Sequence, residues 1–187
     1  MTGLRVGPLG SRCGAGWWGG APRWGVSSGE EPVAGLLQVT RRTAQLVAEW
    51  QCVGFCHGVL NTDNMSVVGL TIDYGPFGFL DRYDPDHVCN ASDTAGRYAY
   101  SKQPEVCKWN LQKLAEALDP ALPLELGEAI LAEEFDAEFR RYYLQKMRKK
   151  LGLVRAELEE DGALVAKLLE TMHLTGECGQ GTQATLC

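Results

Sequence analysis

The apolar positions of the chain predict four helices and one short β hairpin. The first helix face is marked by residues that recur at spacings of three and four: Leu36, Val39, Thr43, Val47 and Trp50. Similar stripes occupy residues 104–119, 126–151 and 161–176. Residues 65–72 are apolar and rich in β-branched side chains around a glycine, which indicates a small hairpin after the first helix. The predicted fold class is mainly α with a small β hairpin.

Composition places this pattern in one domain with a sizeable core, because the chain has 187 residues and is 45% hydrophobic. The net charge of −6 argues against nucleic acid as a partner, and the basic cluster at 140–150 is interleaved with apolar residues, as on a solvated helix face. No apolar run approaches the ~20 residues that a membrane span requires. Seven cysteines, an odd number, exclude complete disulfide pairing within one chain, so we expect buried free thiols.

Residues 1–35 differ from the rest of the chain. They contain ten glycines and the tryptophans Trp17, Trp18 and Trp24, and they lack a hydrophobic period. Two interpretations stay open: a disordered leader, which the composition favours, and a transit peptide, which the arginines ahead of the first acid allow. We therefore divide the chain into a leader at 1–35, a folded part at 36–176 and a flexible tail at 177–187.

The candidate chemistry lies between the first helix and the hairpin. The run HGVLNTDN at 57–64 keeps the His, Leu and Asn of the kinase catalytic loop H-R-D-L-x-x-x-N. Val59 replaces the usual catalytic Asp, but a carboxylate reappears at Asp63, directly before Asn64. Asn64 and Asp73 offer the oxygen ligands that Mg²⁺ prefers, and Asp63 can accept a proton from a hydroxyl. Taken alone, the octet also fits an ordinary turn, since Asp and Asn are common in turns.

The longer run HGVLNTDNMSVVGLTIDYGPFG at 57–78 resembles the selenoprotein O family, whose members are kinase-fold proteins that look like pseudokinases in sequence. The resemblance continues through residues 79–118 and more loosely to about Gly176. It implies a protein-kinase-like C-lobe fragment, an N-lobe that is missing here, and a mitochondrial location. It also implies transfer of AMP from ATP, bound in a flipped orientation, to Ser, Thr or Tyr hydroxyls of proteins.

Matched position by position, the resemblance makes Asp63 the catalytic proton acceptor and makes Asn64 and Asp73 the Mg²⁺ ligands. Asp73 would also contact the nucleotide. The chain carries no G-x-G-x-x-G loop, and upstream of Leu36 no strand offers a lysine for the phosphates. We therefore expect a form truncated at both ends.

Three functional interpretations follow. The first is a Mg²⁺- and ATP-dependent protein adenylyltransferase, and the second is a non-catalytic binding or scaffold form of the same family. An ordinary kinase that transfers the γ-phosphate ranks third, because Val59 removes the usual base.

Overall fold

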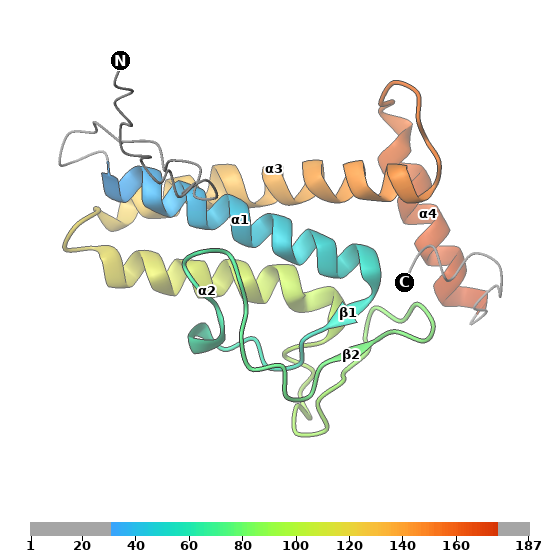
Figure 1. Cartoon of the computed structure of the whole chain (residues 1–187), viewed down its shortest axis with the longest axis horizontal. Helices are drawn as coiled ribbons and strands as arrows, with labels where there is room; N and C mark the ends of the chain where they lie inside the picture. The colour runs from blue at the N-terminus through green and yellow to red at the C-terminus, as the bar shows by residue number, and fades with distance from the viewer. Residues whose placement is uncertain (1–30, 176–187) are drawn as a thin grey trace, which may run out of the picture.

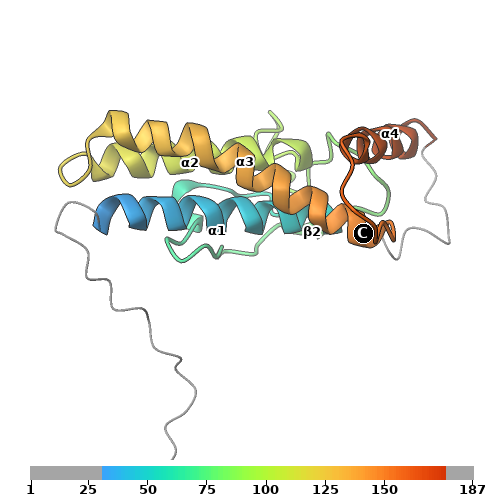
Figure 2. The ribbon, with the colours of Figure 1, turned by 90° about the horizontal axis from the view of Figure 1, so that it is seen from above.

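Helices make up most of the computed structural model, which describes residues 31–175. They are α1 (Glu31–Val53), α2 (Gln103–Leu118), α3 (Leu124–Lys150) and α4 (Glu160–Thr175). Figures 1 and 2 show α1, α2 and α3 running side by side, with α4 against the far end of α3. The prediction of a mainly α fold is confirmed.

Helix α1 begins earlier than its apolar stripe predicted. Its first residue is Glu31, so residues 31–35 of the predicted leader belong to this helix. The helix ends at Val53, and Gly54 follows with a φ of 70°, a backbone conformation that glycine adopts readily and that commonly ends helices. The predictions for residues 1–30 and 176–187 lie outside the described residues.

The main core fills the space between α1, α2 and α3. Its buried members come from all three helices and include Leu36, Val47, Leu111, Leu131 and Phe135. Close approach of the helices depends on a glycine, because a Cβ at Gly127 would lie only 3.1 Å from the Ala115 Cβ.

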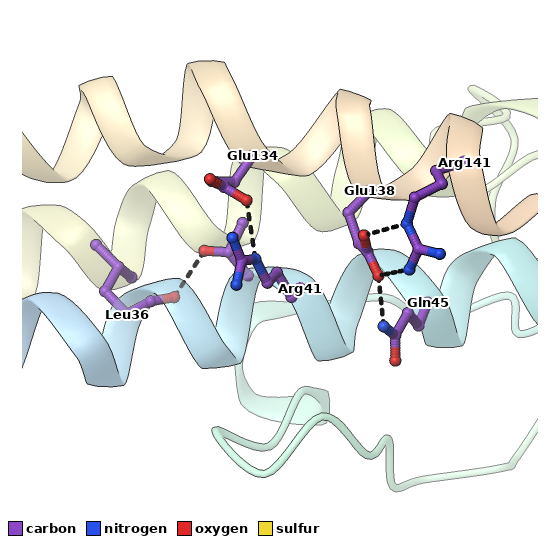
Figure 3. Close-up of polar contacts among 7 residues, drawn as sticks. Leu36, Arg41, Gln45, Glu134, Glu138 and Arg141 are labelled. Atoms are coloured by element: carbon purple, nitrogen blue, oxygen red, sulfur yellow. Dashed lines mark hydrogen bonds and ion pairs between the residues drawn. The ribbon is translucent and has the colours of Figure 1, made fainter. Parts of the chain in front are cut away.

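Polar pairs line the exposed side of the α1–α3 interface (Figure 3). The Arg41 Nε donates to Glu134 at 2.9 Å, and the Gln45 amide donates to Glu138 at 2.5 Å. The Arg41–Glu134 pair is largely exposed and contributes little, so the apolar core decides how the helices pack. The long helix α1 then delivers the chain directly to the candidate loop.

The two-stranded sheet forms at a different place from the predicted hairpin. Strand β1 (Phe55–Cys56) pairs antiparallel with β2 (Gly78–Phe79). The candidate loop is the chain segment that connects these two strands. The predicted hairpin at 65–72 is reduced to one antiparallel bridge between Met65 and Thr71. The Ser66 backbone N–H donates to the Leu70 carbonyl oxygen at 2.8 Å and closes a turn. Few residues of the segment are therefore left to form strand pairs.

Candidate active site

A buried histidine holds the two halves of the site together. The His57 ring is fully buried, and its Nε2 lies 3.0 Å from the Ile72 carbonyl oxygen and 2.9 Å from the Thr71 hydroxyl. The Val59 N–H donates to His57 Nδ1 at 3.3 Å, which assigns the proton to Nε2. Burial lowers the pKa of His57, against the opposing effects of the Ile72 carbonyl and the Asp73 charge. The ring is therefore a neutral scaffold.

The two predicted metal ligands are brought together. The Asn64 Nδ2 donates to the Val59 carbonyl oxygen at 2.8 Å and lies 3.4 Å from the Asp73 Oδ2. The backbone completes this arrangement, because the Ile72 N–H donates to the Asn64 carbonyl oxygen at 3.1 Å. Asn64 is buried and Asp73 is exposed, so an amide on the floor of the site faces a carboxylate at the surface.

Asp73 has an unusual backbone. Among the non-glycine residues of the described chain, it alone has a positive φ, at 60°. Asp and Asn tolerate this left-handed conformation better than other side chains, but it still costs free energy. Strain of this kind is common at functional sites, where surrounding contacts maintain it. Here the contacts of His57 with Thr71 and Ile72 fix the backbone directly before Asp73.

Asp63 is an exposed residue of the same loop. It occupies the middle of a short 3₁₀ helix, Thr62–Asn64, and its side chain is exposed. Within residues 31–175, no hydrogen bond or ion pair joins its carboxylate to Asn64 or Asp73. The structure thus shows Asp63 exposed at the surface, and its role as proton acceptor stays a prediction.

Several residues that sequence reasoning missed support the loop from the outside. Gln103, fully buried at the start of α2, accepts from the His57 backbone N–H and donates to the Phe55 carbonyl oxygen, both at 2.9 Å. Asn110 of α2 donates to the Leu60 carbonyl oxygen at 2.9 Å, and Tyr98 donates to the Asn61 side chain at 2.6 Å. In the sequence, these three residues are distinguished only by being polar: Gln103 and Asn110 belong to an amphipathic helix and Tyr98 to a loop.

The donor set suits Mg²⁺. The Asn64 amide nitrogen is directed at Val59 and Asp73, which leaves the amide oxygen as the atom for a metal. Mg²⁺ is typically bound by one or two carboxylates together with substrate phosphates and waters, so two protein ligands are sufficient. In the described part of the chain, no group of three His, Cys, Asp or Glu side chains could hold a metal ion by itself.

The segment between β2 and α2 is ordered by its own carboxylates. The Asp84 carboxylate accepts from the Asp86 N–H at 3.0 Å, and the Asp93 carboxylate accepts from the Arg97 and Tyr98 N–H groups at 2.9 and 2.7 Å. These side-chain hydrogen bonds to the backbone fix the course of the loop before α2. Free thiols occur as predicted among the described cysteines, with Cys52, Cys56 and Cys107 buried and Cys89 half-buried.

Comparison with known proteins identifies the family of the chain. The family model for protein adenylyltransferase SelO matches residues 30–177. The mitochondrial protein adenylyltransferase SelO of Homo sapiens is 88% identical over 139 residues, which are 74% of this chain and 21% of that protein. The mitochondrial SelO-1 of Danio rerio is 60% identical over 147 residues, which are 79% of this chain and 21% of that protein.

The similarity extends to bacteria. The protein nucleotidyltransferase YdiU of Burkholderia ambifaria is 51% identical over 160 residues, covering 77% of this chain and 30% of that protein. The chain thus spans about a fifth of the length of its animal relatives. The resemblance to selenoprotein O is confirmed: because the family model covers most of the sequence, the chain belongs to the protein adenylyltransferase SelO family.

Proposed function

We propose that this chain carries the catalytic loop of a protein adenylyltransferase, which transfers AMP from ATP to Ser, Thr or Tyr hydroxyls of proteins. The observation that carries the proposal is the 3.4 Å approach of Asn64 to Asp73 over a buried neutral histidine. The names of the relatives, adenylyltransferase and nucleotidyltransferase, support the same reaction class.

In the proposed reaction, the Asp63 carboxylate accepts the proton of the attacking hydroxyl. The hydroxyl oxygen forms a bond to the α-phosphorus of ATP, the bond to the β-phosphate oxygen breaks, and pyrophosphate leaves. Asn64 and Asp73 would hold Mg²⁺, which when bound neutralises charge on the phosphates. The exposure of Asp63 supports its role, because a protein substrate is too large to enter a buried site.

We further propose that these helices form a protein-kinase-like C-lobe, in which α1 leads into the catalytic loop. On both sides of Asp73 in the sequence, hydrophobic side chains are exposed, and we name them together the apolar face. Its seven side chains are 48–60% exposed: Val67, Val68, Leu70, Ile72, Tyr74, Phe77 and Phe79. Such a surface is typical of a contact with another protein region, which agrees with the N-lobe implied by the family. We also extend to this chain the mitochondrial location in the names of its animal relatives.

The apolar face also favours a second candidate function, that of a non-catalytic binding form. Large exposed apolar patches mark interaction sites whether or not chemistry takes place beside them. In that case the loop would keep its fold, because His57 and Gln103 hold it through internal hydrogen bonds.

The test is incubation of a preparation that contains this chain together with the N-lobe of its family, an acceptor protein and ATP labelled at either the α- or the γ-phosphate. Label from the α-phosphate on protein, absent in Asp73→Asn, is the expected result. Label from the γ-phosphate would identify an ordinary kinase. Absence of both labels would favour the binding form.

A further inference from the structure

A basic aromatic cluster lies beside the catalytic loop and has no part in the chemistry proposed above. It consists of Arg97, Tyr98, Trp109 and Lys113. The Arg97 guanidinium carbon lies 4.9 Å from the centre of the Trp109 ring, and the Lys113 Nζ lies 5.3 Å from the same ring. Trp109 is 41% exposed, so the cluster is at the surface.

Arg97 is held in place from both sides. Its backbone N–H donates to the Asp93 carboxylate at 2.9 Å, which fixes the turn, and its guanidinium rests on an aromatic face. A guanidinium stacked on a ring loses less freedom when its N–H edge binds a planar anion. In the part of the chain that the structure describes, no carboxylate lies within ion-pair distance of Arg97, whereas six other cations are paired.

The cluster is connected directly to the catalytic loop. The Tyr98 hydroxyl donates to the Asn61 side-chain oxygen at 2.6 Å, and Asn61 is the residue before the 3₁₀ helix that carries Asp63. Lys113 forms only an exposed pair with Glu116, at 2.6 Å, which a stronger anion can replace. Among the described residues Arg97 has no ion-pair partner, so its guanidinium can pair with an acidic group of a partner.

We propose that Arg97, stacked on Trp109 and flanked by Lys113, binds an acidic side chain of the protein substrate and so directs a neighbouring hydroxyl to Asp63. This inference rests on the proposed function, since it assigns the substrate class of the same site. The preferred acceptors are hydroxyl residues next to Asp or Glu.

The test measures binding rather than transfer, so it remains informative if the chain transfers no AMP. A fluorescent serine peptide flanked by glutamates is titrated against the chain, alongside the same peptide with glutamines. We expect the glutamate peptide to bind about tenfold more tightly at low salt. Arg97→Gln should remove this preference, whereas Arg155→Gln, which deletes an exposed arginine between α3 and α4, should keep it.

Equal binding of the two peptides, or an unchanged preference in Arg97→Gln, would overturn the proposal. The anion could instead be a phosphate of the nucleotide, and a further titration with ATP and Mg²⁺ separates these sources. If Arg97→Gln weakens ATP binding and leaves the peptide preference intact, the cluster is a nucleotide site and the proposal is wrong.

Discussion

At the scale of single residues, the site is built from a neutral histidine and a strained aspartate. His57 donates from Nε2 to the backbone directly before Asp73, and Asp73 adopts a φ of 60°. The hydrogen bonds of the buried His57 ring thus offset the free-energy cost of the left-handed backbone conformation at Asp73. This division of work separates the residues that hold the loop from those proposed to act on ATP.

The strain at Asp73 allows charge and conformation to be tested separately. Asp73→Asn should preserve stability, because asparagine also tolerates positive φ, but ATP affinity should no longer increase when Mg²⁺ is added. Asp73→Ala should lose the same metal effect and also about 1 kcal/mol of stability. Calorimetry with and without Mg²⁺ and a denaturant titration measure the two effects. A full Mg²⁺ response in Asp73→Asn would contradict the metal assignment.

Asn64 provides a graded comparison at the same site. Asn64→Ala should weaken the Mg²⁺ response less than Asp73→Asn does, since a neutral carbonyl oxygen attracts the ion less than a carboxylate. The same calorimetric titration ranks the two variants. If Asn64→Ala proved the more damaging for the Mg²⁺ response, the assignment of Asp73 as the principal ligand would be wrong.

The lowered pKa of His57 predicts a loss of stability in acid. Below its ordinary value of 6.5 the unfolded chain binds the proton first, so the free energy of unfolding falls from there until the pH passes the lowered folded-state pKa. Urea unfolding at about pH 7.5 and about pH 5.5 should show a larger loss for the wild type than for His57→Gln, by up to about 1.4 kcal/mol per pKa unit. Equal losses would show that His57 does not carry this dependence.

At the scale of elements, the periodic helices were predictable and the loop geometry was not. The stripes at 104–119 and 126–151 correspond to α2 and α3 within two residues at each end, because these helices bury one regular face. Asn64 and Asp73 meet because the turn between Ser66 and Leu70 returns the chain to Asn64. The support from Gln103 and Asn110 was not predictable, because it depends on how α2 packs against the loop.

Helix α4 is attached to the other helices by one buried ion pair and a small apolar cluster. Arg148 of α3 pairs with Asp161 of α4, and both side chains are at most 10% exposed. Removing one partner of such a pair typically costs about 3–5 kcal/mol. Asp161→Asn should therefore speed hydrogen exchange in α4 and leave α1–α3 protected, whereas Glu160→Gln, an exposed neighbour, should change neither. Unchanged exchange in α4 would show that the apolar cluster alone holds it.

At the scale of the whole molecule, the apolar face is an exposed hydrophobic part of the surface. No helix of residues 31–175 is long and apolar enough to cross a membrane. Exposed apolar area favours association by ~25 cal/mol per Å². The family model matches residues 30–177, which include this face, whereas most of the predicted leader at 1–35 lies before the match and has no hydrophobic period. The sequence pattern did not reveal the apolar face, because residues 65–72 were predicted to pair as a hairpin rather than to form an exposed turn.

We expect the chain to self-associate through the apolar face. The double variant Val68→Gln and Leu70→Gln should increase the monomer fraction in analytical ultracentrifugation, because both side chains are at least 51% exposed there. Val154→Gln with Leu158→Gln removes similar exposed residues between α3 and α4 and should have little effect. A monomeric wild type with a sharp, reversible melting transition would contradict this expectation.

The most direct measurement of the central claim is the effect of Asp63→Asn on AMP transfer and on ATP affinity. Both are determined on one preparation that contains this chain together with the N-lobe of its family. If Asp63 accepts the proton, ATP affinity should stay nearly unchanged while transfer of the α-label falls by about 10²–10⁴-fold. Glu133→Gln, which removes an exposed carboxylate from α3, should change neither quantity. Transfer at the wild-type rate in Asp63→Asn would contradict the account, since asparagine can form the same turn but cannot accept the proton.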